Sequence, residues 1–368
     1  MGVVTTLLDT ATWTMRAADG LLTEICQERW EQLSMNEVMI FFAGLLALIV
    51  GAELIVRGAS RLAALLGINP LLIGLTIVSI GTSMPELAVG IAAGLQGSGP
   101  LAVANIAGTN LVNILFILGL SALIRPLALH LQVLNLDLPM MIVAAAALAG
   151  LASDGVLTPL EGVLMVGASA IYTLAVVRSS RAESDYVKGE FEDMCGDGFM
   201  ESCGPKALSP ERKELLAKAK YAAMLIAGMA ITVIGADWLV DGATGLARMI
   251  DIPEAIIGLS IVAIGTSAPE LVTTIVATLR DERDVAIGNL LGSSIYNILL
   301  VLGLAALAAP TGLTVTRQLQ LFDIPLMTLV ALACVPVFLT GRRISRLEGG
   351  LGVSAYMIYL IWLVLFRA

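Results

Sequence analysis

The stretch GAELIVRGASRLAALLGINPLLIGLTIVSIGTSMPEL (51–87) returns as GADWLVDGATGLARMIDIPEAIIGLSIVAIGTSAPEL (235–271). The copies are 184 residues apart, align without a gap and are identical at 20 of 37 positions. Each copy carries a glutamate, Glu86 or Glu270, within an otherwise apolar span. A carboxylate in hydrocarbon is costly unless it faces a cavity or a partner. The repetition of this costly group predicts that the chain holds something charged there.

The rest of the chain is also strongly apolar. Of its 368 residues, 58% are hydrophobic and 14% charged, against about 25% charged in soluble domains. The apolar runs are continuous and rich in Gly and Ala, which favours packed helices over a β-barrel. The sequence therefore predicts an all-α integral membrane protein with ten transmembrane helices of about 20 residues each. They are expected near 37–56, 69–94, 101–124, 132–152, 160–178, 220–240, 254–279, 285–308, 321–340 and 348–366.

The basic residues predict the orientation of these spans. With the N-terminus outside, 16 of the 21 Lys and Arg residues fall on the cytoplasmic side, as the positive-inside rule requires. Both termini are then non-cytoplasmic, in a multi-pass protein expected in the cell inner (cytoplasmic) membrane. Residues 1–36 lack the pattern of a secretory signal peptide and are expected to form an N-terminal extension, with an interfacial helix as one option.

Five spans separate the two copies of the motif. Because each crossing reverses direction, the second copy enters the membrane from the opposite side, which predicts two inverted-topology repeats of five helices. Further matches support this division: Pro126 with Pro310, LDLP (136–139) with FDIP (322–325), and LEG (160–162) with LEG (347–349). The first repeat is expected over 37–178 and the second over 220–368.

Residues 179–219 are predicted to form a cytoplasmic acidic linker between the repeats. Its acidic cluster could sense a regulatory cation, but it lacks the spacing of an EF-hand loop, and like-charged runs are usually solvated connectors. The four cysteines, Cys26, Cys195, Cys203 and Cys334, are too scattered for a disulfide framework. A metal site at Cys195 and Cys203 is not favoured.

Polar side chains follow one face of the second and seventh spans. Their spacing is i, i+3, i+4, i+7, which places the side chains on one side of a helix. The first set is Ser79, Thr82, Ser83 and Glu86. The second is Thr266, Ser267 and Glu270, with Ala263 at the place of Ser79. A proline precedes each glutamate, and proline inside a helix removes a backbone hydrogen bond. We therefore expect broken helices whose carbonyls around 81–83 and 265–267 are free to coordinate cations.

A second polar strip lies on each following span. It comprises Asn105, Thr109 and Asn113 in the first repeat, and Asn289, Ser293 and Asn297 in the second. Gly108 and Gly292 are expected to let the facing helix approach closely. Two carboxylates with amide, hydroxyl and carbonyl oxygens suit calcium, which takes 6–8 oxygen ligands. The absence of Cys and His from these faces argues against zinc or copper.

Other charged residues carry weaker signals. Glu53 and Asp237 match across the repeat and are expected either along the ion path or at the membrane boundary. Asp137 and Asp323 precede prolines near helix starts and are interpreted as N-caps. His130, the one histidine, is interpreted as incidental in a short cytoplasmic loop.

Each polar residue must be weighed against a purely structural role. A single Ser or Thr in a membrane helix usually bonds its own backbone, and Thr82 alone would be interpreted in that way. Here a glutamate, a preceding proline and two hydroxyls coincide twice at equivalent positions. This coincidence favours a binding site.

The paired GTSxPE segments with their GNxxGSxxxN-like partners resemble the cation/calcium exchanger superfamily, specifically the sodium/calcium exchanger type. The resemblance covers the chain from about residue 37. It implies ten helices in two alpha repeats and exchange of one calcium for about three sodium ions. By motif position it implies that Glu86 and Glu270 are the principal calcium ligands, with oxygens from Thr82, Ser83, Thr266 and Ser267 and with Asn113 beside them. Ser79, Thr109, Ala263 and Ser293 would border the sodium sites.

The chain departs from this family at Asn297, where many relatives carry Asp. The pocket then keeps two carboxylates, which disfavours potassium co-transport and puts the stoichiometry in doubt. The alternatives are a calcium/proton antiporter, whose members typically show GNxxE instead of GTSxPE, or potassium-dependent exchange. An intramembrane hydrolase is disfavoured because the spans contain no histidine. Calcium and sodium are expected as substrates in a lipid bilayer, with no cofactor, no nucleic acid and no obligate protein partner.

Overall fold

A computed structural model gives the fold of residues 35–194, 210–249, 263–339 and 341–367. The first-repeat elements are α2 (Met35–Leu66), α3 (Pro70–Ile73), η1 (Gly74–Val78), α4 (Ser79–Thr82), α5 (Met84–Leu95), α6 (Gly99–Leu111), η2 (Val112–Ile117), α7 (Leu118–Ile124), β1 (Leu127–Ala128), η3 (Val133–Asp137), α8 (Leu138–Leu151), η4 (Ala152–Asp154), β2 (Val156–Leu157) and α9 (Pro159–Met194). The second-repeat elements are α11 (Pro210–Met249), α13 (Ala263–Thr266), α14 (Ala268–Leu279), α15 (Arg283–Tyr296), η6 (Asn297–Leu302), α16 (Gly303–Ala308), β3 (Leu313–Thr314), η7 (Leu319–Asp323), α17 (Ile324–Leu339), β4 (Arg343–Ile344) and α18 (Arg346–Arg367).

The prediction of a helical membrane protein is confirmed. In the described residues, seven helices are long and apolar enough to cross a bilayer, or eight if the bent pair 70–82 and 84–95 forms one span. The expected last span, 348–366, lies within α18. The expected seventh span, 254–279, is described only from residue 263 onward.

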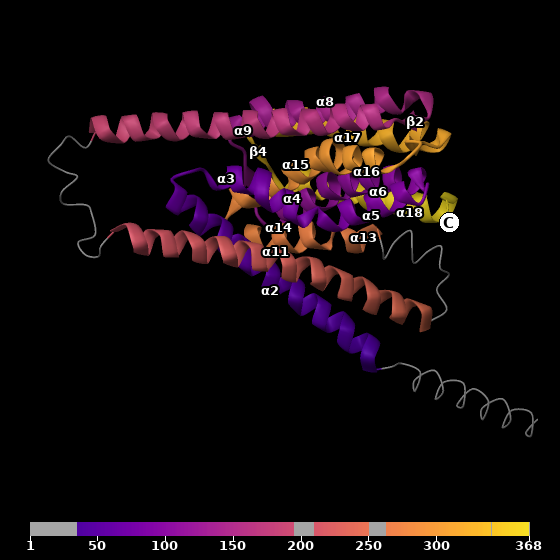
Figure 1. The fold of residues 1–368 in the computed structure, drawn as a ribbon, viewed down its shortest axis with the longest axis horizontal. Helices are drawn as coiled ribbons and strands as arrows, with labels where there is room; N and C mark the ends of the chain where they lie inside the picture. The colour runs from indigo at the N-terminus through magenta and orange to yellow at the C-terminus, as the bar shows by residue number, and fades with distance from the viewer. Residues whose placement is uncertain (1–34, 195–209, 250–262, 340, 368) are drawn as a thin grey trace, which may run out of the picture.

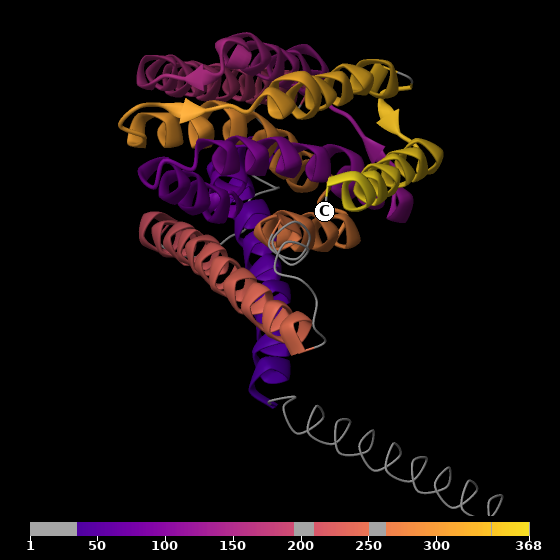
Figure 2. The same cartoon turned by 90° about the vertical axis from the view of Figure 1, so that its right-hand side faces the viewer.

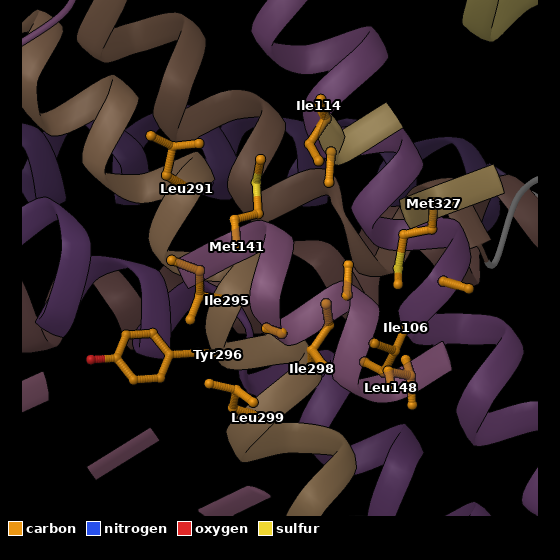
Figure 3. Close-up of a cluster of buried hydrophobic side chains, with 14 of the residues drawn as sticks. Ile106, Ile114, Met141, Leu148, Leu291, Ile295, Tyr296, Ile298, Leu299 and Met327 are labelled. Atoms are coloured by element: carbon orange, nitrogen blue, oxygen red, sulfur yellow. The ribbon is translucent and has the colours of Figure 1, made fainter. Parts of the chain in front are cut away.

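The helices stack in layers, with α8 and α9 along one side of the molecule and α2 and α11 along the other (Figure 1, Figure 2). Between these layers lie α6 and α15, whose apolar side chains form one core with those of α8 and α17. Figure 3 shows how Ile106, Met141, Ile298 and Met327 point into one cluster from these elements and η6. The helices that carry the polar strips are therefore the most enclosed, because α15 and α6 are surrounded by the other helices.

Glycines allow α2 and α11 to cross in close contact (Figure 2). A Cβ atom placed on Gly44 would lie 2.8 Å from the carbonyl oxygen of Gly235, and one on Gly51 would lie 2.9 Å from that of Gly228. Gly228 and Gly235 are the repeat equivalents of Gly44 and Gly51, so the two contacts are copies of each other. Because the residue numbers rise along α2 as they fall along α11, these equivalent helices run antiparallel.

Two short antiparallel sheets each pair a strand of the first half with a strand of the second half. β1 pairs with β4 through Leu127 and Ile344, and β2 pairs with β3 through Leu157 and Leu313. Leu313 follows Leu127 by 186 residues and Ile344 follows Leu157 by 187 residues, so the two pairs are repeat equivalents of each other. β1 and β2 flank the helix of residues 133–154, so the sheets lie toward opposite ends of the bundle, as the labels of β4 and β2 in Figure 1 show.

Asp137 does not cap a helix, which corrects its interpretation from the sequence. Its side chain makes no cap hydrogen bond at the start of α8. It instead lies fully buried and accepts a hydrogen bond from the Tyr172 hydroxyl, with Oδ1 and Oη 2.9 Å apart. The Tyr172 ring packs edge-on against Tyr296, with ring centroids 5.7 Å apart. The physical reason is burial. A carboxyl group inside the bundle needs a hydrogen-bond donor, and the Tyr172 hydroxyl supplies it.

Tyr172→Phe should therefore destabilise the protein by about 1–3 kcal/mol, the usual cost of leaving a buried polar group without its partner. Thermal unfolding of the purified protein in detergent would measure the loss. Tyr356→Phe is the matched control, because Tyr356 is also buried but makes ring contacts and no hydrogen bond through its hydroxyl among the described residues. Equal stabilities for the two variants would contradict the role given to Tyr172.

Charged residues at one end of the bundle are paired on the surface. Glu53 contacts both Arg57 and Arg280, and its side chain is partly exposed. His130 lies 2.9 Å from Asp284, joining the segment before η3 to the start of α15. The interpretation of His130 as incidental therefore missed its contact with Asp284, because a position in a loop does not indicate a partner. Asp237 is exposed on α11.

The segment expected as a linker is partly helical. α9 continues to Met194 and α11 starts at Pro210, so both helices extend well beyond the predicted spans. Cys26, Cys195, Cys203 and most of the N-terminal extension lie outside the described residues. Cys334 is buried as a free thiol in α17.

Candidate functional site

Two broken helices carry the glutamates. α4 ends at Thr82 and α5 starts at Met84, with a bend of 46° between the two helical stretches. Ser83 sits at the break with φ −83° and ψ 12°, and Ser267 repeats this conformation at φ −85° and ψ 4°. Pro85 and Pro269 occupy the first turn of the following helix, where a missing N–H costs little. The predicted breaks are thus present at both GTSxPE segments.

The expectation of freed carbonyls is wrong for both serines at the breaks. The carbonyl of Ser83 accepts a hydrogen bond from Leu87 N at 3.1 Å, and that of Ser267 accepts one from Leu271 N at 3.0 Å. The physical reason is the position of the proline, because in the first helical turn it removes a single N–H and leaves the next turns intact. The backbone oxygens of these two serines are therefore already engaged within their helices.

Glu86 and Glu270 occupy the first turns of α5 and α14, where the helix dipole favours negative charge. Both are fully buried, and Ser83, at the break just before Glu86, donates a hydrogen bond to Glu270. Neither forms an ion pair with a basic side chain among the described residues. Neither carboxylate oxygen of Glu86 meets a hydrogen-bond donor in that part of the chain. Two like charges are thus enclosed together without a protein cation.

Hydroxyl groups connect the two halves around these carboxylates. Ser83 Oγ donates to Glu270 Oε1 at 3.0 Å, and Ser293 Oγ lies 3.5 Å from the same oxygen. Thr82 Oγ1 lies 3.5 Å from Ser293 Oγ. Ser267 Oγ lies 3.5 Å from Thr109 Oγ1. Residues from both halves therefore line one buried polar region, as the repeated motif predicted.

Asn113 and Asn297 lie within the π-helical segments η2 and η6, or at their start. η2 packs against α14, which carries Glu270, and η6 packs against α5, which carries Glu86. Both asparagines are fully buried, and neither their amide oxygens nor their nitrogens find a hydrogen-bond partner among the described residues. π-helical turns frequently occur at functional sites, and these two carry their asparagines on segments that pack against the glutamate-bearing helix of the other half.

These unpartnered atoms define the chemistry of the site. Buried polar atoms are normally satisfied, and leaving each one unpaired costs about 1–3 kcal/mol. The unpaired atoms include both carboxylate oxygens of Glu86, Oε2 of Glu270 and the amide oxygen of each of Asn113 and Asn297. Oxygen ligands of this kind bind hard cations such as calcium and sodium. In the described residues, no group of three or more His, Cys, Asp and Glu side chains offers a transition-metal site.

The remaining predicted residues are placed as follows. Ser79 is fully buried, and its hydroxyl donates to Leu75 O of its own helix at 2.7 Å, while its carbonyl accepts from Ser293 Oγ at 3.2 Å. Thr266 is buried on α13. The side chain of Ala263 lies outside the described part of the chain.

The close approach of the facing helix that was expected at Gly292 is present. A Cβ atom there would lie 2.5 Å from Leu75 O and 2.6 Å from Ser79 Oγ, so α15 touches the facing segment. For Gly108, no atom of the described residues lies within 4 Å of the same position, and the segment equivalent to η1, 258–262, lies outside them.

Two site residues were missed in the ligand set drawn from the sequence. Asn289 accepts a hydrogen bond from Thr82 and donates one to Thr274, so it belongs to the same polar region. Asn289 was visible in the second polar strip, but Thr274 has Gly90 as its repeat equivalent and lay outside the shared motif. Comparing where the two halves differ, and not only where they agree, could have found it.

Comparison with known proteins places this architecture in a family. A solved structure of the sodium-calcium exchanger NCX_Mj, soaked with 10 mM Na+ and zero Ca2+, superimposes with a TM-score of 0.74 and 25% identity, covering 89% of this chain and 98% of that chain. The inner membrane protein YrbG of Escherichia coli is 34% identical over 89% of this chain and 95% of its own length. The sodium/calcium exchanger MaX1 of Methanosarcina acetivorans is 32% identical over 88% and 97%.

The family model described as sodium/calcium exchanger protein matches residues 36–178 and 220–365, which are the two predicted repeats almost in full. The match therefore spans both polar strips and both GTSxPE segments. The chain is a multi-pass membrane transporter of cations and belongs to the sodium/calcium exchanger protein family, within the cation/calcium exchanger superfamily.

Proposed function

We propose that this protein is a secondary active antiporter that exchanges calcium for sodium across the cytoplasmic membrane. The observation that carries the proposal is the enclosure of Glu86 and Glu270 together, among buried oxygens that find no partner in the described residues. One calcium ion would neutralise both carboxylates. The names of MaX1 and NCX_Mj, both sodium/calcium exchangers, support the choice of ions.

In this proposal Glu86 and Glu270 are the principal calcium ligands. Oxygens from Thr82, Ser83, Thr266, Ser267, Asn113 and Asn297 complete the coordination, and Ser79, Thr109, Ala263 and Ser293 border the flanking sodium sites. Ser83 already donates to Glu270, and Ser293 lies between Thr82 and Glu270, which supports a shared cage from both halves. Sodium and calcium would then compete for the same oxygens.

The proposed topology has ten transmembrane helices in two inverted repeats, with both termini on the non-cytoplasmic side. The antiparallel crossing of α2 and α11 supports the inversion, because these helices are repeat equivalents. The exchange of strand partners between β1, β2, β3 and β4 supports the same relation.

Alternating access follows from charge neutralisation. With both carboxylates ionised and no cation bound, moving the site past apolar neighbours is expensive, whereas an ion-loaded site is close to neutral. Loaded states would thus rearrange and the empty state would not, which couples the two ions. If three sodium ions exchange for one calcium, each cycle moves one net charge and responds to membrane voltage.

Purified protein in sodium-loaded liposomes should take up calcium when diluted into sodium-free buffer. Uptake should vanish when the sodium gradient is dissipated with an ionophore, and it should need neither a pH gradient nor potassium. Liposomes without protein give the background. Uptake driven by protons alone would reject sodium coupling in favour of a calcium/proton antiporter, and an absolute requirement for potassium would indicate the potassium-dependent type.

A further inference from the structure

Asn289 ties the two halves together through both ends of its amide. Its Nδ2 donates to Thr274 Oγ1 on α14 at 3.1 Å, and its Oδ1 accepts from Thr82 Oγ1 on α4 at 3.0 Å. All three side chains are buried. The contact therefore reaches from a residue outside the ligand set to the Thr82 hydroxyl at the site.

In the described residues of the first half, the hydrogen bond to the amide nitrogen is missing. Asn105, the repeat equivalent of Asn289, has an amide nitrogen without a partner among the described residues. The position equivalent to Thr274 is Gly90, where a Cβ atom would already lie 3.4 Å from the Cβ of Ala305. Among the described residues the amide nitrogen is thus held by a hydroxyl in the second half only, where Thr274 stands in place of Gly90.

Thr274 anchors the NH2 end of the Asn289 amide, with the oxygen end toward Thr82. Because its hydroxyl takes the NH2 group of Asn289, the amide oxygen is left to accept the Thr82 proton. A hydroxyl that donates in this way keeps its lone pairs for a cation. If the amide turned over, its NH2 group would donate to Thr82 Oγ1 and occupy a lone pair.

We propose that Thr274 is a positioning residue for sodium: it fixes the Asn289 amide so that Thr82 presents its oxygen to an ion bound beside Ser79 and Ser293. This inference rests on the proposed exchange function. Thr82 Oγ1 lies 3.5 Å from Ser293 Oγ, which in turn contacts Ser79 O, so neutral oxygens meet at this point. A monovalent ion held mainly by neutral oxygens depends on each of them, whereas calcium is held chiefly by the two carboxylates.

Thr274→Val should raise the apparent KM for sodium about 3- to 10-fold, the effect expected from one misplaced hydrogen bond. The apparent KM for calcium, measured in the same liposomes, should change much less. Thr274→Ser retains the hydroxyl and should restore the sodium KM. Thr278→Val is the matched control, because the Thr278 hydroxyl donates to Thr274 O of its own helix at 2.8 Å and makes no contact with the amide.

An unchanged sodium KM in Thr274→Val, or an equal change for sodium and calcium, would overturn the inference. Absence of sodium-driven calcium uptake by the unmodified protein would instead contradict the exchange function, so the two failures are distinguishable. If Thr274→Val does not fold, Thr274→Ala can be compared with Thr274→Ser by thermal unfolding in sodium or choline chloride. Sodium should stabilise Thr274→Ser more than Thr274→Ala, and equal stabilisation would equally overturn the role.

Discussion

Glu86→Gln and Glu270→Gln should each abolish calcium transport while leaving the protein folded. Each substitution keeps the size of the side chain and removes one of the two negative charges that a calcium ion would neutralise. Removing one partner of a buried pair of opposite charges, here the carboxylate that would face calcium, costs about 3–5 kcal/mol, which corresponds to more than a hundredfold loss of affinity. Calcium uptake into sodium-loaded liposomes measures the effect, and thermal unfolding in detergent checks the fold.

Glu53→Gln is the control for these variants. Glu53 lies in the same repeated stretch, but its side chain is partly exposed and pairs with Arg57 and Arg280 at the boundary, where ion pairs contribute little. It should transport calcium as the unmodified protein does. Retained exchange in Glu86→Gln or Glu270→Gln would remove the basis for the proposed ligand role.

Gly292→Ala should also abolish transport, and in addition lower stability. The added methyl group would meet Leu75 O and Ser79 Oγ at 2.5 and 2.6 Å, and the backbone oxygen cannot move aside without shifting its helix. α15 would then be displaced from η1 and α4, and Ser293 would lose its contacts with Ser79 and Thr82. Overpacking of this kind typically costs about 1–3 kcal/mol. Calcium uptake and thermal unfolding measure the two effects.

Gly167→Ala tests whether this effect belongs to the contact or to helical glycines in general. Gly167 lies in α9 on an exposed face, and a Cβ atom there would have no atom of the described residues within 4 Å. Transport and stability should be unchanged or slightly improved, because alanine favours the helix. Normal transport by Gly292→Ala would show that the close approach of α15 is not needed to build the site.

The location of the site could be predicted from the sequence because costly groups leave a strong signal. Glu86 and Glu270, each preceded by a proline and two hydroxyls, recur at equivalent positions of an apolar chain, which favours a binding site over a structural role. Periodicity then placed Thr82 and Ser293 on faces that the structure brings to 3.5 Å. The spacing of residues along a single helix is enough to predict a site residue where the same spacing recurs on the equivalent helix of the other repeat.

What could not be predicted depends on contacts between distant segments. The bond from Tyr172 to Asp137 needs the relative rotation of two helices, which spacing along each helix does not contain. The role of Thr274 arises from a difference between the halves and was invisible to a comparison that sought identity. The carbonyls of Ser83 and Ser267 were misjudged because the effect of a proline depends on its place in the turn.

The exchanged strands and the crossed glycine helices make the chain equivalent to a dimer of unlike subunits joined by a tether. Each half completes its end sheets with strands of the other, so neither half has an independent hydrophobic interior. Two separate subunits would dissociate on dilution, but a tether holds the local concentration of the partner constant. The molecule should consequently melt as one cooperative unit, at a temperature independent of how dilute the sample is.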